Sequence, residues 1–503
     1  MSGRRRLVIA CVAAVLVLAP IGFLWWTSLL PGSLSVMEMG YLDRGGVTGP
    51  AGHDGHGAPS PAEPSDDAGT VDVTSLVADP DRPPDVEVTL TARHQRFELA
   101  SGRTVDGYTL NGESPGPLIE ATAGQLVQVR LVNESVPDGI TLHWHGVDVP
   151  NAEDGVAGVT QDAVGVGQEH TYRFVAGQVG TFWYHSHQVA HEQVRRGLLG
   201  PLVIRAAADP AVQDADVQDV VMLAHTYDGA RTLNGQQGDV RVEAAPGQQA
   251  RVRLVNTDNG AMSVWVTGAP YRVLAVDGTD LAGPTDVDGQ YLLVTAGGRA
   301  DLGVTVPPDG GAVRIQVGGS TSVVLGPAGA DVPPAGQPRA ALDLLGYGTP
   351  GELPFDASAP DRTFEYSIGR RPGFVDGRPG MFWTVNGHLY PDLPMFEVAE
   401  GDVVRMRIEN HSGQPHPMHL HGHHVVVLSR NGTPSTGTPW WADSLEVANG
   451  DSYDVAFRAD NPGIWMDHCH NLPHAQQGLV AHLVYEGVTT PFTLGGPASN
   501  LPE

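Results

Sequence analysis

A short motif recurs three times along the 503-residue chain and constrains the fold more than any other sequence feature. It reads Arg-Leu-Val-Asn at residues 130–133 and 253–256, and Arg-Ile-Glu-Asn at residues 407–410. Each copy follows an Asn-Gly pair, which is a strong turn signal between strands. Internal repetition indicates a chain built from similar units. We therefore expect three related domains in tandem.

The repeats have the residue pattern of β-strands. Val127, Val129 and Leu131 alternate with polar neighbours, and a similar alternation surrounds the other two copies. Alternation with a period of two is typical of half-buried strands in antiparallel sheets, and no long helical periodicity follows the N-terminal segment. The expected fold is all-β, with three β-sandwich domains. Their expected boundaries are residues 85–206, 207–335 and 362–490.

The N-terminal segment predicts membrane targeting. Residues 4–6 are arginines, and residues 7–30 form an uncharged, mainly apolar run. A cleaved signal peptide has an apolar region of only about 7–15 residues, whereas this run is long enough to cross a bilayer. The preceding arginines predict a cytoplasmic N-terminus and an extracytoplasmic remainder. We expect a signal anchor in residues 1–30, and the alternative is a cleaved signal peptide and a secreted protein.

Composition limits the remaining possibilities. Residues 31–84 are rich in Gly, Pro, Ser and Asp, which predicts a flexible linker. The net charge of −28 argues against nucleic acid as a partner, because phosphate binding needs a basic surface. The two cysteines are Cys11, inside the apolar run, and Cys469. This count excludes a disulfide scaffold and thiolate-rich metal sites.

Histidines gather in four short clusters, and each cluster contains a His-x-His pair. The clusters are His143-Trp144-His145, His185-Ser186-His187, His416 to His421, and His468-Cys469-His470 with His474. Residues two apart on a strand point to the same face, about 6.6 Å apart, so one pair can serve one metal or two neighbouring metals. Only the first and third repeats carry such clusters. The middle domain is therefore expected to be structural, or a wall of the site, without a metal of its own.

The ligand types point to copper. Ten imidazoles and one thiolate exceed the four ligands of a zinc site. Two histidines and one cysteine with a weak or absent axial ligand are typical of a trigonal blue-copper site. His416, Cys469 and His474 fit this description, with Leu479 in the axial place.

The four clusters, in this order, resemble the four copper motifs of the multicopper oxidases, a family that includes laccases and metallo-oxidases. The resemblance covers residues ~85–490 and implies three cupredoxin-like Greek-key domains that hold four coppers. It implies that His416, Cys469 and His474 bind the type 1 copper, and that His143 and His419 bind the type 2 copper. The implied ligands of the two type 3 coppers are His145, His185, His187, His421, His468 and His470.

The resemblance also implies a reaction. A small donor (a phenol, an aromatic amine or a low-valent metal ion) would give single electrons to the type 1 copper through His474. Cys469 would pass them to a three-copper cluster between the first and third domains, where dioxygen is reduced to water. Asp154 resembles the family's proton-donating carboxylate, and Asp148 is a possible second relay.

Two positions depart from many relatives. Ala475 stands where many bacterial relatives have an acid, which puts a second proton route in doubt. Leu479 stands where many have an axial methionine, so a three-coordinate type 1 copper of higher potential is expected. We also expect a monomer.

Two other functions use part of this residue set. A blue-copper electron carrier or copper-binding protein needs only His416, Cys469 and His474, and leaves the eight other histidines of the clusters unexplained. A copper nitrite reductase also has a type 1 site, but it does not need both His468 and His470 beside the cysteine. The identity of the donor is not predicted by the sequence.

Overall fold

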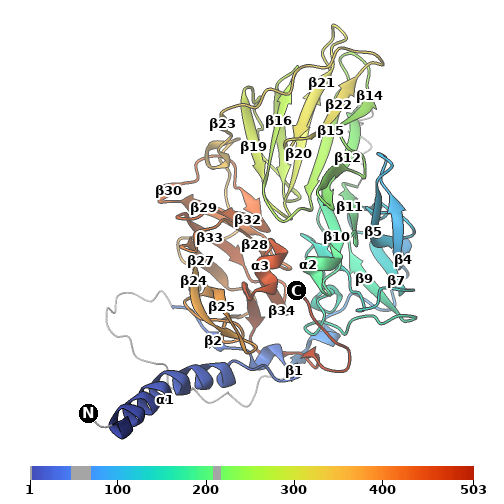
Figure 1. Ribbon diagram of the computed structural model, residues 1–503. Helices are drawn as coiled ribbons and strands as arrows, with labels where there is room; N and C mark the ends of the chain where they lie inside the picture. Colours follow the sequence, from blue (N-terminus) through green and yellow to red (C-terminus); the bar gives the residue numbers. More distant parts are fainter. Residues whose placement is uncertain (1–2, 47–69, 208–216) are drawn as a thin grey trace.

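The computed structural model describes residues 3–46, 70–207 and 217–503. Most of these residues form strands, which build three successive sandwiches of two sheets each (Figure 1). The expected all-β fold with an N-terminal helix is confirmed. We call the three units the first, middle and third sandwich.

The first sandwich has two four-stranded sheets. One sheet has the order β5 (Thr104–Leu110), β4 (Val86–Glu98), β7 (Leu126–Asn133), β9 (Glu169–Val175). The other has the order β6 (Ile119–Thr122), β11 (Leu199–Arg205), β10 (Gly180–His185), β8 (His143–His145). The buried core between them includes Leu131 and Trp144, one from each sheet.

The middle sandwich has two six-stranded sheets. The first is β13 (Ala230–Leu233), β12 (Val217–Tyr227), β15 (Gln249–Asn256), β20 (Arg299–Thr305), β17 (Tyr271–Val276), β18 (Thr279–Asp280). The second is β14 (Asp239–Glu243), β22 (Thr321–Gly326), β21 (Val313–Val317), β16 (Met262–Thr267), β19 (Gln290–Val294), β23 (Ala340–Ala341). Leu254 and Val264 contribute to its core from the two sheets.

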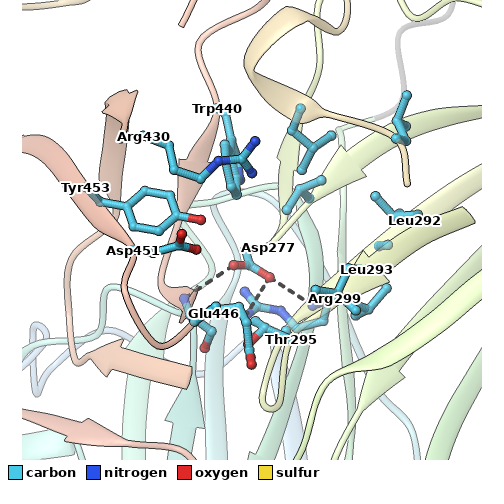
Figure 2. A pocket seen from close by; sticks show the side chains of 18 residues that line it. Asp277, Leu292, Leu293, Thr295, Arg299, Arg430, Trp440, Glu446, Asp451 and Tyr453 are labelled. Carbon is cyan, nitrogen blue, oxygen red and sulfur yellow. Dashed lines mark hydrogen bonds and ion pairs between the residues drawn. The ribbon is translucent and has the colours of Figure 1, made fainter. Parts of the chain in front are cut away.

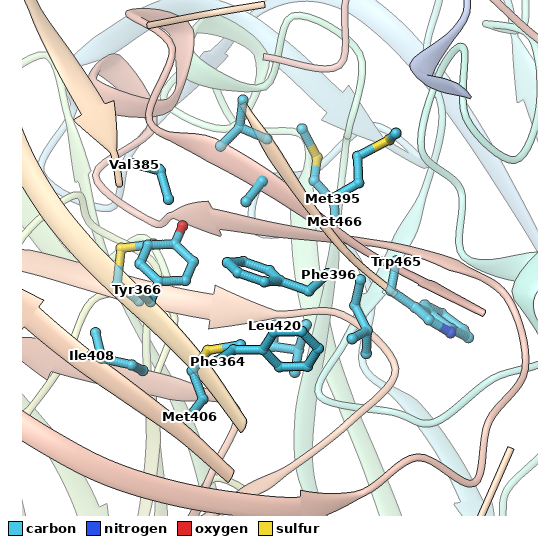
Figure 3. Packing of buried hydrophobic residues seen from close by; sticks show 14 of the residues in the cluster. Phe364, Tyr366, Val385, Met395, Phe396, Met406, Ile408, Leu420, Trp465 and Met466 are labelled. Atoms are coloured by element: carbon cyan, nitrogen blue, oxygen red, sulfur yellow. The ribbon is translucent and has the colours of Figure 1, made fainter. Parts of the chain in front are cut away.

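The third sandwich carries the remaining large sheets. One is β2 (Tyr41–Asp43), β26 (Pro394–Val398), β35 (Val480–Tyr485), β34 (Ile464–Cys469), β28 (His416–Leu420), β32 (Ser444–Val447). The other is β25 (Arg378–Val385), β24 (Arg362–Val375), β27 (Val403–Asn410), β33 (Ser452–Arg458), β29 (Val425–Arg430), β30 (Thr433–Pro434), with β31 (Trp441–Ala442) on β29. Figure 3 shows the aromatic and methionine side chains of its core, among them Phe364, Phe396 and Met406.

Short elements join these sheets. The helices are α1 (Gly3–Thr27), α2 (Ala190–Gln193) and α3 (Leu472–Gln476). The 3-10 turns are η1 (Val36–Glu38), η2 (Val73–Ser75), η3 (Asn151–Glu153) and η4 (Leu344–Gly346). Two-stranded sheets pair β1 (Ser33–Leu34) with β37 (Leu494–Gly495) and β3 (Val71–Asp72) with β36 (Val488–Thr489).

The repeated asparagines make the same hydrogen bonds in each sandwich. Asn111, Asn234 and Asn386 all have positive φ, between 48° and 56°, which suits a turn residue with a short polar side chain. The Asn111 side chain accepts from Thr91 N and donates to Thr89 O, and the other two bond the preceding strand in the same way. These asparagines of the Asn-Gly pairs therefore fix the same kind of turn in each of the three sandwiches.

Two expectations need correction. The sheets are mixed rather than antiparallel, because β4 pairs with β7, β12 with β15 and β24 with β27 in parallel. Residues 31–84 are not wholly a flexible linker, since residues 33–34, 41–43 and 71–72 form strands paired with the third sandwich or the C-terminal segment. Strand pairing uses main-chain groups, so a segment poor in apolar side chains can still join a sheet. Residues 47–69 of that range lie outside the described residues.

The N-terminal helix has the length and composition of a membrane span. Leu7–Thr27 has a mean hydropathy of 2.9, and none of this segment is buried by the rest of the chain. The helix end contacts the hairpin formed by β24 and β25, where Asp376 N donates to Ser28 O at 2.9 Å. This helix is compatible with an extracytoplasmic location for the sandwiches.

Candidate metal centre

One ligand set lies within the third sandwich, around Cys469. The Cys469 Sγ atom lies 3.5 Å from His416 Nδ1 and 3.7 Å from His474 Nδ1, and the two Nδ1 atoms are 3.1 Å apart. Strand β28 supplies His416, the end of β34 supplies Cys469, and the short helix α3 supplies His474. Three soft or borderline donor atoms thus converge from one sandwich on one point.

Leu479 is fully buried in the same core as Cys469. Its backbone carbonyl accepts a hydrogen bond from Cys469 N at 3.1 Å, and its N–H donates to His474 O at 3.1 Å. These two hydrogen bonds hold helix α3, and with it the His474 imidazole, next to Cys469. Because its side chain is hydrocarbon, Leu479 offers no fourth ligand.

The other eight histidines of the clusters meet between the first and third sandwiches. In the first sandwich, β8 and β10 are neighbours, and His143 lies opposite His185 in their register. In the third, β28 and β34 are neighbours, and His419 lies opposite His468. The full set is His143, His145, His185, His187, His419, His421, His468 and His470. All eight side chains are at most 1% exposed.

The distances between these rings join the two sandwiches. His143 Nε2 lies 3.4 Å from His419 Nε2. His468 Nε2 lies 3.4 Å from His187 Nε2 and 3.2 Å from His421 Nε2. The ring centroids of His145 and His470 are 4.9 Å apart.

Nitrogen atoms left without partners show that the residues fit a metal. The protein uses one nitrogen of most of these rings: His419 Nδ1 donates to Asp443 O, and His185 Nδ1 donates to Ser186 O. Among the described residues, the buried His145 Nδ1 and His185 Nε2 and both ring nitrogens of His470 have no hydrogen-bond partner. Buried polar atoms without partners are costly, and copper is the group whose ligand preference these imidazoles and one thiolate meet.

Burial keeps the imidazoles neutral, as metal binding requires. It lowers the pKa of His145, His185 and His421 well below the usual value, and neighbouring imidazoles lower it further. The pKa of His416 falls to about 3 through burial and then through His474. Burial raises the pKa of the Cys469 thiol, so a bound metal must displace its proton.

Asp154 and Asp148, the two carboxylates expected to relay protons, lie in different surroundings. The oxygens of Asp154 each lie 3.0 Å from an Nδ1 atom, one on His143 and one on His421. This buried carboxylate orients both rings, so that His143 Nε2 faces His419 and His421 Nε2 faces His468. Asp148 is partly exposed and lies 3.5 Å from His424, so it reaches the ligands only through other side chains.

Asp443 is a central residue that the sequence did not single out. It lies on the loop before β32, and its carboxylate is 3.1 Å from His145 Nε2. Arg299 of the middle sandwich donates two hydrogen bonds to it, at 2.5 and 2.7 Å, and both side chains are completely buried. The Arg299 charge holds the pKa of Asp443 well below its usual range despite burial.

The middle sandwich therefore forms a wall of the site. A Cβ at Gly297 would lie 2.8 Å from His145 Cε1 and 2.9 Å from His470 Cδ2, so only glycine fits against these rings. Asp277 accepts a hydrogen bond from Arg299 N at 2.8 Å. Figure 2 shows Asp277 and Arg299 in a cavity of about 170 Å³ between the middle and third sandwiches.

Glu503 is the second residue that sequence reasoning missed. Its carboxylate lies 3.1 Å from His468 Nδ1 and 3.9 Å from His187 Nε2. Its segment crosses to the first sandwich, where Val189 N donates to Leu501 O at 2.6 Å. Glu503 thus places a carboxyl group beside His468 and His187, two of the expected type 3 ligands. No motif in the sequence indicates this position.

Comparisons with known proteins agree with this geometry. Two family models described as multicopper oxidase match residues 91–209 and 370–487. The multicopper oxidase MmcO of Mycobacterium tuberculosis is 27% identical over 461 residues, which cover 80% of this chain and 87% of that protein. Laccase-1 of Botryotinia fuckeliana is 28% identical over 76% of this chain and 79% of its own length. The chain belongs to the multicopper oxidase family.

Solved structures of this family share the fold. The multi-copper oxidase from Pseudomonas thermotolerans has a TM-score of 0.65 and 26% identity, covering 79% of this chain and 98% of that one. This multicopper oxidase is therefore a copper-dependent oxidoreductase that uses oxygen as its electron acceptor. The comparisons give no support to the nitrite reductase or electron-carrier alternatives.

Proposed function

We propose that the chain binds four coppers and couples oxidation of a small donor to reduction of dioxygen to two waters. The type 1 ligands are His416, Cys469 and His474. The type 2 ligands are His143 and His419, whose Nε2 atoms lie 3.4 Å apart. The type 3 ligands are His187, His421 and His468 for one copper, and His145, His185 and His470 for the other. The observation that carries this proposal is the convergence of unpartnered, buried imidazole nitrogens from two sandwiches.

Copper bound in these sites supplies one-electron redox chemistry. The chain connects the two ligand sets covalently, because His468 and His470 flank Cys469 directly. Successive residues of an extended chain point to opposite faces, so Cys469 faces the third sandwich while both histidines face the first. Electrons that enter beside Cys469 therefore have a short path to the buried cluster.

His474 is the entry point for the donor. Its imidazole is only partly buried, whereas the His416 ring is completely buried. Ser412 Oγ lies 2.7 Å from His416 Nε2 and occupies that nitrogen. The Nε2 atom of His474 has no hydrogen-bond partner among the described residues and stays available to a donor in solution.

Asp154 relays protons to the site of oxygen reduction in this proposal. It contacts one type 2 and one type 3 ligand at the same distance, 3.0 Å, and it is 1% exposed. A carboxylate placed between the two kinds of ligand can deliver protons where oxygen is reduced. Asp148 is less well placed, since His424 and Asp443 lie between it and His145.

We further propose that the chain is anchored to the membrane, with its three domains at residues 85–206, 207–335 and 362–490 outside the cytoplasm. The contact between Ser28 and the β24–β25 hairpin supports retention of the helix, because cleavage after the apolar run would remove it. N-terminal sequencing of the mature protein tests this: a start beyond residue 30 would contradict the anchor.

Copper analysis tests the central proposal. Fully loaded protein should contain four coppers per chain and should consume oxygen only when a reducing donor is present. One or two coppers per chain, with all eleven ligands intact, would rule out the three-copper cluster.

A further inference from the structure

The surface beside His474 carries the positive charge of an exposed arginine, Arg370. Trp383 of β25 packs against His474, with 4.6 Å between ring centroids, and it is 2% exposed. Arg370 of β24 lies directly opposite Trp383 in the hairpin register. Its guanidinium carbon is 4.7 Å from the Trp383 ring centroid, which is a cation–π contact.

This stack brings the guanidinium close to the electron entry point. Arg370 covers Trp383, Trp383 covers His474, and the Arg370 side chain is exposed. The charge therefore lies within about 10 Å of the His474 ring, roughly one Debye length at 0.1 M salt. Burial lowers the pKa of His474 to about 4, and the charge of Arg370 is the second cause of this shift.

The helix that carries His474 has no carboxylate of its own, and Asp376 and Glu503 line the cavity beside its end. The residues that follow His474 are Ala475, Gln476 and Gln477, and none of them is charged. A ferrous or manganous donor needs oxygen ligands, and a cuprous donor needs several soft ones. The chain as a whole has a net charge of −28, so this positive spot stands against an acidic background.

We propose that Arg370 determines donor specificity by charge, so that anionic and neutral phenols are oxidised at His474 and metal cations are disfavoured. This inference rests on the proposed role of His474 as the electron entry point. The free His474 Nε2–H donates a hydrogen bond to the phenol oxygen, and a carboxylate on the same ring pairs with the Arg370 guanidinium.

The redox balance needs no additional reactant. Each phenol loses one electron to the protein and one proton to solvent, and leaves as a phenoxyl radical. Four phenols supply the four electrons that, with four protons and one dioxygen, form two waters. The oxidant is the dioxygen of the established activity.

The test compares two phenols with the same ring and matched potential, one with a propionate side chain and one with a trimethylammonium side chain. Arg370→Glu reverses the charge, Arg370→Gln removes it, and Arg370→Lys keeps it. Arg371→Glu is the matched control, because Arg371 is the next residue of the same strand, is also exposed, and pairs with Phe382 on the opposite face.

We expect wild-type enzyme to favour the anionic phenol in kcat/KM at low salt. Arg370→Glu should lower the anionic-to-cationic ratio about tenfold or more, Arg370→Gln less, and Arg370→Lys and Arg371→Glu about twofold at most. The ratio cancels any shift in type 1 potential, since both donors face the same copper. About 1 M salt should remove the effect of Arg370→Glu.

Equal changes in Arg370→Glu and Arg371→Glu would overturn the proposal, because they would show a general charge effect. Ferrous turnover faster than that of both phenols in wild type would also overturn it. Failure of the proposed function is a different result: no donor would then drive oxygen uptake in any variant. The blue absorption of each variant shows that its type 1 site has formed.

Discussion

The ligand sets proposed for the type 1 copper and for the three-copper cluster, here the type 1 set and the three-copper ligand set, differ in how they are built. All three type 1 ligands come from the third sandwich, and one of them, His474, reaches the surface. The cluster ligands come from two sandwiches, and every one is buried. A site within one sandwich needs only that sandwich to fold, whereas the cluster also needs the first and third sandwiches to dock correctly. Changes in one set should therefore leave the other largely intact.

The largest expected effect separates the two sets completely. Cys469→Ser removes the thiolate that only the type 1 site uses, and should abolish the blue colour and donor-driven oxygen uptake. The cluster ligands do not include this sulfur, so about three coppers per chain should remain. Elemental analysis and oxygen uptake measure both results, and retained uptake would show that electrons do not enter beside this residue.

Asp154→Asn should act on the cluster alone. The amide keeps the shape of the carboxylate but cannot carry the proton, so steady-state oxygen uptake should fall about 10²–10⁴-fold. Anaerobic reduction of the type 1 site by the donor should keep its wild-type rate, because Asp154 contacts His143 and His421 only. Stopped-flow absorption measures that rate. A parallel loss of both rates would mean that the substitution disturbs the whole molecule.

Arg299→Met tests how far the cluster depends on docking. It leaves the Asp443 carboxylate buried without its guanidinium, which should cost about 3–5 kcal/mol in free energy of unfolding. Copper in the cluster should fall more than type 1 copper. Arg272→Met is the control, since Arg272 pairs with Asp286 on the surface and its loss should change the free energy of unfolding far less. Urea unfolding compares them, and equal costs would contradict a structural role of the buried pair.

The smallest expected effect lies in the type 1 set. Leu479→Met supplies a thioether of similar volume, so the free energy of unfolding should change by less than about 1.5 kcal/mol. The type 1 potential should fall, because an added donor stabilises the oxidised copper. Redox titration decides this: an unchanged or higher potential in fully loaded protein would mean that residue 479 is not axial.

The sequence predicted the ligands better than their surroundings. His-x-His pairs on strands are local, so spacing alone places two rings on one face. Asp443 and Glu503 have no such spacing, and their contacts exist only after separate sandwiches have docked. Arg299 could not be predicted as the partner of Asp443 for the same reason. The parallel pairing of β4 with β7 was also missed, since alternation reports which face is buried and not the direction of the neighbouring strand.

The short strand β2 limits how far the sandwiches can move relative to the N-terminal helix. Only five residues separate the end of α1 at Thr27 from β1 at Ser33, and β2 then joins the edge of the sheet that contains β28 and β34. If α1 stays in the membrane as we propose, this short connection would keep the sandwiches close to the point of attachment. They would turn only as far as the residues between helix and strand allow. Donors would then diffuse to an enzyme held at a nearly constant height above the bilayer.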